Sequence, residues 1–128
     1  MADLLLVDDD ARLAELCAWF LARSGHEVRT AGSYREAREL LAERVPQLML
    51  ADLDLGAESG RVELRNLAAE GLLPPTLVVS GYLDAALGAE LEAIENVCGT
   101  LPKPFDPGEL ATRVELCLAR ETAAEGGG

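Results

Sequence analysis

The run Leu48-Met49-Leu50-Ala51-Asp52 is uninterruptedly apolar until its last residue, which is acidic. Apolar residues without polar alternation are typical of a strand that is buried on both faces of a parallel sheet. Comparable runs occur at residues 4–7, 76–79 and 97–101, and the more polar residues 26–31 are expected to form an edge strand. The chain therefore contains five candidate strands.

Segments with helical periodicity separate these runs. In the first segment, apolar residues recur at i, i+3, i+4 and i+7, which predicts one buried helix face made of Leu13, Leu16, Cys17 and Phe20. A capping box from Ser33 to Glu36 opens the second helix. Further helices are expected over residues 62–69, over 83–94 and after the capping residue Asp106. Strands that alternate with helices predict an α/β fold, with a five-stranded parallel doubly wound sheet and five helices.

Length and composition limit the organisation and the partners of the chain. Its 128 residues suit one domain, expected over residues 1–120, and the polar, glycine-ended residues 121–128 are expected to be a disordered tail. A net charge of −12 argues against direct nucleic-acid binding. No apolar run is long enough to span a membrane, and no secretory signal opens the sequence.

The three cysteines are odd in number and far apart, at positions 17, 98 and 117. This spacing fits neither a disulfide framework nor a pair of metal ligands. We therefore expect reduced thiols and a cytoplasmic protein.

Polar side chains gather where the buried strands end. Asp8, Asp9 and Asp10 follow the first strand. Asp52 ends the run of residues 48–52, and Asp54 comes two residues later. Ser80 follows the next buried strand, and Lys103, the only lysine among 11 basic residues, follows the last one. Binding sites in such sheets form beyond the carboxyl ends of the strands, so these side chains should converge at one edge.

The converging side chains predict phosphoryl-transfer chemistry. Carboxylates about 5 Å apart repel by about 3 kcal/mol per pair at an effective dielectric constant of 20, so a cation is expected among them. Oxygen ligands alone favour Mg²⁺, with Asp8 and Asp9 as ligands. Asp52 ends a central strand and is the best candidate for a nucleophile that forms an aspartyl-phosphate, with Lys103 and Ser80 beside the transferring oxygens. Each aspartate alone would more commonly be a turn or helix cap; the coincidence of four positions carries the hypothesis.

With these motifs in this order, residues 3–120 resemble the response-regulator receiver domains of two-component signalling. The motifs are Val7-Asp8-Asp9, Leu50-Ala51-Asp52-Leu53-Asp54-Leu55 with Gly60, Val79-Ser80-Gly81, and Leu101-Pro102-Lys103-Pro104-Phe105. The resemblance implies a flavodoxin-like sheet with strand order 2-1-3-4-5 and a cis Lys103–Pro104 bond.

The resemblance also implies roles for these residues. Asp52 would accept a phosphoryl group from the phosphohistidine of a histidine kinase or histidine phosphotransfer protein, and would release it by autodephosphorylation. Asp8, Asp9, Asp52 and the backbone carbonyl of Asp54 would hold Mg²⁺, while Ser80 and Lys103 would contact the phosphoryl group. Such a domain is a signalling switch and not a turnover enzyme. We further hypothesise that Asp54 and Tyr82, which flank the phosphorylation site, tune the hydrolysis rate.

Other residues are candidates for partner contact. Trp19 falls outside the apolar stripe of its helix, and an exposed tryptophan can anchor an interface. Family partners dock around the first helix and the loop after the fifth strand, which adds Asp10, Leu13 and Phe105. Thr100 stands where many family members carry an aromatic residue, so the readout of the signal must differ from the usual aromatic movement. The downstream partner is not identified by the sequence, and we expect a monomer or a phosphorylation-dependent dimer.

Two other functions remain open. A degenerate receiver could serve only as a docking module. The Asp52-Leu53-Asp54 triplet also resembles the Asp-x-Asp of haloacid-dehalogenase-like phosphatases, although there the acidic metal pair comes after that motif and not before it. The length leaves no room for a DNA-binding output domain, and a start at Met1 fits a stand-alone regulator or an amino-terminal receiver.

Overall fold

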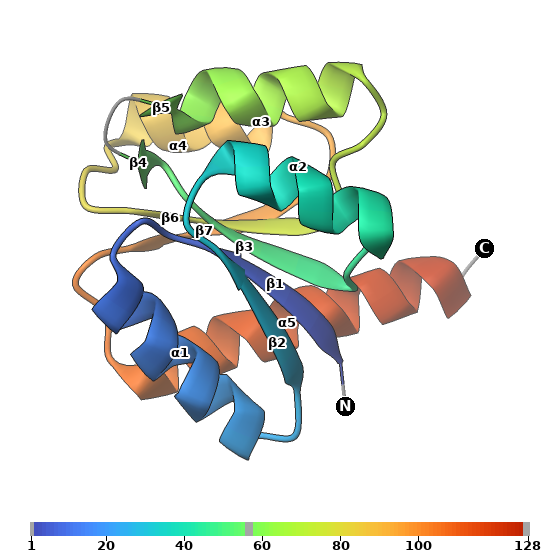
Figure 1. Cartoon of the computed structure of the whole chain (residues 1–128). Helices are drawn as coiled ribbons and strands as arrows, with labels where there is room; N and C mark the ends of the chain where they lie inside the picture. Colours follow the sequence, from blue (N-terminus) through green and yellow to red (C-terminus); the bar gives the residue numbers. More distant parts are fainter. Residues whose placement is uncertain (1, 56–57, 127–128) are drawn as a thin grey trace.

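The computed structural model describes residues 2–55 and 58–126, and it folds into a five-stranded sheet with helices on both faces (Figure 1). The short strands β4 (Asp54–Leu55) and β5 (Glu58–Ser59) form a separate two-stranded antiparallel sheet. The sheet strands are β1 (Asp3–Val7), β2 (Glu27–Ala31), β3 (Leu48–Asp52), β6 (Thr76–Ser80) and β7 (Val97–Pro102). The helices are α1 (Ala11–Arg23), α2 (Tyr34–Glu43), α3 (Gly60–Ala69), α4 (Ala85–Glu92) and α5 (Pro107–Gly126). The strands lie in the order β2-β1-β3-β6-β7 and all neighbours are parallel, which confirms the predicted topology.

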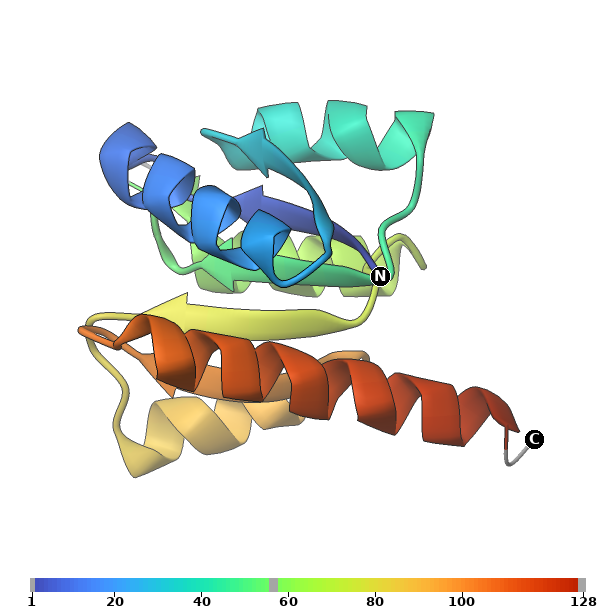
Figure 2. The same ribbon diagram turned by 90° about the horizontal axis from the view of Figure 1, so that it is seen from below.

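Two apolar clusters fill the space between the sheet and its helices. Helices α2, α3 and α4 cover one face, and α1 and α5 cover the other (Figures 1 and 2). Strand residues alternate between the clusters: Leu5 and Met49 pack towards α2 and α3, whereas Leu4 and Leu50 pack towards α1 and α5. The sheet is thus buried on both faces, which explains why its central strands read as continuous apolar runs.

Short polar side chains cap the amino-terminal ends of four helices, as the residue types at these positions predict. Asp10 caps α1 by accepting from the Leu13 amide, and Ser33 caps α2 by accepting from the Glu36 amide. The Glu36 carboxylate accepts a hydrogen bond from the Gly32 amide; in a standard capping box it would accept from the amide of the capping residue, here Ser33. Ser59 and Asp84 cap α3 and α4 in the same way.

The buried face of α1 differs from the predicted one. The buried residues are Ala14, Cys17 and Leu21, whereas Leu16 is 57% exposed. The apolar spacing allowed two overlapping stripes on this helix, and the stripe that contains Ala14, Cys17 and Leu21 is the one that packs into the cluster under α1 and α5.

Helix α5 also extends beyond the expected domain boundary at residue 120. It continues to Gly126, through residues 121–126 that were expected to belong to a disordered tail; residues 127 and 128 lie outside the described part of the chain. Glutamate and alanine in this segment favour continuation of the helix. Within the described residues, no helix is both long and apolar enough to cross a membrane.

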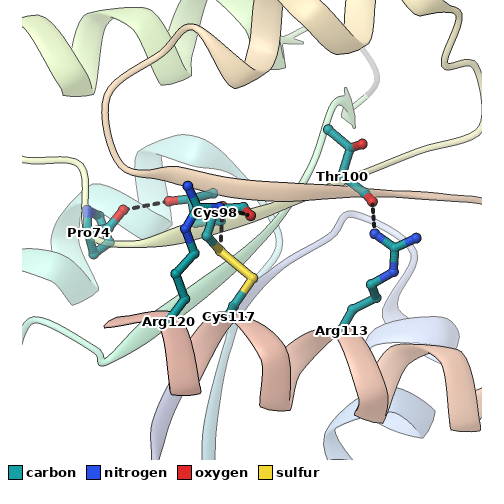
Figure 3. The surroundings of a disulfide bond; sticks show 7 residues. Pro74, Cys98, Thr100, Arg113, Cys117 and Arg120 are labelled. Atoms are coloured by element: carbon teal, nitrogen blue, oxygen red, sulfur yellow. Dashed lines mark hydrogen bonds between the residues drawn. A yellow bond between two sulfur atoms is a disulfide. The ribbon is translucent and has the colours of Figure 1, made fainter. Parts of the chain in front are cut away.

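The expectation of three reduced thiols is wrong. Cys98 in β7 and Cys117 in α5 form a disulfide, and Cys17 is a free, buried cysteine (Figure 3). The pairing depends on an irregularity in β7: Thr76 pairs with Val97 and Leu77 with Gly99, so that Cys98 is the extra residue of a bulge. Linear spacing could not reveal this bulge, which places Cys98 opposite Cys117.

Two glycines give a test of this packing. A Cβ atom on Gly60, at the start of α3, would lie 2.6 Å from Leu53 Cα, whereas one on Gly88, inside α4, would meet nothing within 4 Å. We expect Gly60→Ala to destabilise the fold by about 2 kcal/mol or more, because backbone atoms must move. Gly88→Ala should stabilise it by about 0.5–1 kcal/mol through helix propensity.

Urea unfolding followed by circular dichroism measures both changes in the free energy of unfolding. Equal effects of the two substitutions would show that the contact between the start of α3 and Leu53 is not as tight as described.

Candidate functional site

The register of the sheet brings the predicted polar residues to one edge. Val7 pairs with Ala51, so Asp8 follows β1 beside the last residue of β3, Asp52. Asp52 in turn pairs with Val79, and Ser80 pairs with Pro102, the residue before Lys103. From β1 the chain first adds β2 on one side and then adds β3 on the other side. Binding sites in this architecture form at such a switch in strand order, here between β1 and β3.

Three carboxylates meet at this edge. Oxygens of Asp8, Asp9 and Asp52 all lie within 4.8 Å of one another, with Asp8 and Asp52 buried and Asp9 exposed. A set made only of carboxylate oxygens, with one side open to solvent, matches the ligand preference of Mg²⁺. The residues therefore fit the ion that the sequence predicted.

Lys103 supplies the positive charge among these carboxylates. Its Nζ lies 2.7 Å from Asp52 Oδ2 and 3.5 Å from Asp8 Oδ2. Burial by itself lowers the pKa of Lys103, but its hydrogen bond to Asp52 and the charges of Asp52 and Asp8 raise that pKa above its ordinary value. The ammonium is therefore held in its charged form beside Asp52. The Lys103–Pro104 bond is cis, as the resemblance implied.

Backbone groups hold the two buried carboxylates in place. Asp8 Oδ1 accepts from the Asp10 amide at 2.9 Å, and Asp52 Oδ1 accepts from the Asp54 amide at 2.9 Å. Burial raises the pKa of the Asp8 carboxyl, and the Asp10 amide and Lys103 only partly oppose this effect. Ionised Asp8 is therefore held at some cost in stability.

Ser80 and Asp54 form a second part of the site. The buried Ser80 Oγ lies 3.3 Å from Asp54 Oδ2, and the same carboxylate oxygen accepts from the Gly81 amide at 3.0 Å. Ser80 Oγ also accepts from the Tyr82 amide at 3.1 Å. Tyr82 itself is 71% exposed, and its hydroxyl lies 3.4 Å from Asp84. The Asp54 carboxylate thus accepts from the Gly81 amide, and it competes for the single Ser80 hydroxyl proton with the Tyr82 carbonyl, which lies 3.1 Å from Ser80 Oγ.

The structure adds two groups that the sequence reasoning did not include. The buried Tyr34 hydroxyl donates to the Asp52 carbonyl at 2.8 Å, and the Gly81 amide points at Asp54. A buried tyrosine hydroxyl usually has a hydrogen-bond partner, so Tyr34 could have been expected to donate to some acceptor. Which acceptor it contacts depends on how α2 packs over β3, and the sequence does not give that.

The candidate partner-contact residues lie at the start of α1, along α1, in β7 and in the loop between β7 and α5. Asp10 caps α1, and Leu13 and Phe105 are partly buried against the cluster under α1 and α5. Trp19 is 57% exposed with the Arg23 guanidinium 4.8 Å from its ring centroid. Thr100 is partly buried in β7 and its carbonyl accepts from Arg113. Their role in partner contact stays a prediction.

Comparison with known proteins agrees with this geometry. Residues 4–115 match the family model of the response regulator receiver domain. The chain belongs to this family.

The receiver is 34% identical over 125 residues to the transcriptional regulatory protein CpxR homolog of Haemophilus influenzae, covering 96% of this chain and 53% of that protein. It is 32% identical over 124 residues to the alkaline phosphatase synthesis transcriptional regulatory protein PhoP of Bacillus subtilis, covering 94% and 50%. The chain thus spans about half the length of these relatives.

Solved structures show the same fold. NtrX from Brucella abortus is 25% identical with a TM-score of 0.86, covering 98% of this receiver and 29% of that chain. A CheY-like response regulator receiver domain protein from Methanospirillum hungatei has a TM-score of 0.86 at 20% identity, covering 97% and 98%. Family members of this kind are signalling switches of two-component systems, generally non-enzymatic, and typically bind Mg²⁺ at an acidic cluster.

The cost of ionised Asp8 gives a pH-dependent prediction for the metal-free protein. Folding raises the pKa of Asp8, so the folded state favours the protonated carboxyl. The free energy of unfolding is therefore unaffected by this ionisation below the unfolded pKa of Asp8, about 4, and it falls as the pH rises through the folded pKa. Asp8→Asn should therefore raise the free energy of unfolding by about 1 kcal/mol at pH 7 and by close to nothing near pH 4.

Urea unfolding in the presence of a chelator measures this difference, with Asp9→Asn as the matched control because Asp9 is exposed. A stabilisation by Asp8→Asn that is equal at both pH values would show that ionisation of Asp8 is not its source.

Proposed function

We propose that this receiver is a phosphorylation-controlled switch whose phosphoacceptor is Asp52. In the proposed step, an Asp52 carboxylate oxygen attacks the phosphorus of a phosphohistidine on a histidine kinase or phosphotransfer protein. The P–N bond breaks and histidine is the leaving group. The observation that carries this proposal is that one buried carboxylate, Asp52, lies within reach of both Lys103 and two further carboxylates.

Each neighbouring side chain has a role in the proposed step. Lys103, charged and 2.7 Å from Asp52, would stabilise the negative oxygens of the transferring group. Asp8, Asp9, Asp52 and the Asp54 carbonyl would hold Mg²⁺, which supplies further charge compensation when bound. Ser80 would donate to a phosphoryl oxygen once its hydroxyl turns away from Asp54 and the Tyr82 carbonyl. Hydrolysis of the aspartyl-phosphate would return the switch to its resting state.

We further propose that the domain works in the cytoplasm and acts on a protein partner. Phosphohistidine donors that use cytoplasmic ATP would place the domain in the cytoplasm. The net charge of −12 favours a protein output over direct contact with nucleic acid. The downstream partner is left open, and phosphorylation would shift an existing equilibrium of the face that α4, β7 and α5 form.

Labelling by a small donor tests the phosphoacceptor. With acetyl phosphate and Mg²⁺, intact-mass measurement should show one added phosphoryl group on the wild-type chain and none on Asp52→Ala. Asp54→Asn is the matched control, because it changes a neighbouring carboxylate that is not the proposed acceptor, and it should still be labelled.

Omission of Mg²⁺ should reduce the labelling rate at least tenfold, since the carboxylates then repel the incoming phosphate. A chain that stays unlabelled with the ion present would instead support a docking module. Labelling of Asp52→Ala to the wild-type extent would place the acceptor elsewhere.

The position of Asp54 predicts an effect on the lifetime of the phosphorylated state. Its carboxylate accepts from the Gly81 amide, lies 3.3 Å from Ser80 Oγ and would lie beside a phosphoryl dianion. Asp54→Ala frees the Gly81 amide, removes one of the two acceptors beside Ser80 Oγ and removes one repulsion of about 1 kcal/mol, so the aspartyl-phosphate should persist about fivefold longer.

A phosphate-release time course after removal of the donor measures this lifetime. Tyr82→Ala, which removes an exposed ring but keeps the Tyr82 amide, serves for comparison. Unchanged release from both variants would end the hypothesis that the residues flanking the site tune hydrolysis.

A further inference from the structure

The sulfur pair on the α5 side of the sheet is not used by the proposed phosphoryl chemistry. Cys98 and Cys117 join β7 to α5, with their Cα atoms 5.8 Å apart (Figure 3). This Cα separation is an ordinary one for bridged cysteines, so the backbone needs no displacement to close the pair. The bulge in β7 is what presents Cys98 to α5.

The open, dithiol form also has a place in the same structure. Cys98 Sγ lies 3.2 Å from the Thr76 carbonyl, to which a thiol at this position can donate. Cys117 is buried in the apolar cluster under α5, where a thiol is well tolerated. Both oxidation states are therefore compatible with the fold.

Two arginines surround the pair. Arg113 and Arg120 lie four residues before and three residues after Cys117, on the same face of α5, and donate to the carbonyls of Thr100 and Cys98 (Figure 3). Both side chains are exposed, and with the two cysteines they line a pocket of about 260 Å³. Their remaining N–H groups can bind the carboxylates of an anionic reaction partner.

We propose that Cys98 and Cys117 are a reversible thiol–disulfide site that reacts with small anionic peptide disulfides of the glutathione type. The Cys98 thiolate, the more exposed of the two, attacks one sulfur of the small disulfide and breaks its S–S bond. One small thiol leaves and takes up the proton lost by Cys98. Cys117 then attacks the Cys98 sulfur of the mixed disulfide, and the second small thiol leaves with the Cys117 proton. The two cysteines are oxidised, and one small disulfide is reduced to two thiols.

The reversible character follows from the setting. On the proposed function the chain works in the reducing cytoplasm, where disulfides are usually transient and redox-sensing. Cys17 offers an internal contrast, because it is buried and its pKa is raised by burial and by the charge of Asp8. Cys17 should therefore remain a thiol under conditions that close the other pair.

Exchange with defined probes tests the site on the full chain. The reduced protein is incubated with glutathione disulfide, quenched with an alkylating agent and weighed intact. We expect two of the three cysteines to be lost to alkylation in wild type and in Asp52→Ala, and both remaining cysteines to be lost in Cys17→Ser; all should be recovered with reduced glutathione. Cys117→Ser should stop at the mixed disulfide on Cys98. Loss of Cys17 alkylation, or no intramolecular product in wild type, would overturn the proposal.

A charge-reversed probe tests the arginines. The exchange rate with glutathione disulfide is compared with that of cystamine, a cationic disulfide, each divided by its rate with a free model thiol. Wild type should prefer the anionic probe by about threefold or more despite its net negative charge, because distant charges are screened beyond about 10 Å at 0.1 M salt. The Arg113→Gln/Arg120→Gln variant should lose this preference. A preference that is absent in wild type, or retained in the variant, would contradict the anionic class.

Thermal unfolding keeps the proposal testable if a variant folds poorly. Closing a loop between positions 19 residues apart should raise the Tm of wild type by roughly 10 °C relative to its reduced form. An equal Tm of the oxidised and reduced forms would show that the bridge does not tie α5 to β7 in the folded chain. Because these measurements do not use Asp52, they succeed or fail independently of the proposed phosphoryl transfer.

Discussion

The repulsion between three neighbouring carboxylates, offset by one ammonium, is the constraint on which the site depends. Asp8, Asp9 and Asp52 bring their oxygens within 4.8 Å, and Lys103 contacts Asp52 at 2.7 Å. At this separation, carboxylates repel by about 3 kcal/mol per pair at an effective dielectric constant of 20. A fold maintains such a cluster only if its backbone is rigid there, and the parallel sheet supplies this rigidity because every contributing strand is hydrogen-bonded to its neighbours.

The same arrangement links the resting state to the proposed signal. Lys103 follows β7 and Ser80 ends β6, so two groups that would contact a phosphoryl oxygen belong to the strands furthest from α1. Ser80 is meanwhile held by Asp54 and by the Tyr82 backbone, and Thr100 replaces the aromatic residue expected from the family resemblance. A shift of Ser80 would therefore be transmitted through β6 and β7 themselves, and the disulfide from Cys98 to α5 lies on the same strand.

Sequence reasoning predicted the elements that depend on local pattern. Continuous apolar runs identified the buried strands, and the residues after each run identified Asp8, Asp52, Ser80 and Lys103, because parallel strands end at a common edge. What it missed depends on how elements pack. The bulge at Cys98, which pairs this residue with Cys117, arises from register between strands, and the exposure of Leu16 arises from how α1 turns towards the sheet. Neither the register nor the rotation of a helix can be read from spacing along one chain.

A crystal structure of the receiver with Mg²⁺ and a fluoroberyllate phosphoryl mimic would show whether Asp52 receives the phosphoryl group. We expect the mimic on the Asp52 carboxylate and the ion among Asp8, Asp9 and Asp52. Lys103 should contact the mimic, and Ser80 Oγ should turn from Asp54 towards it. A mimic or ion bound away from Asp52, with the contact between Lys103 and Asp52 unchanged, would show that Asp52 is not the phosphoacceptor.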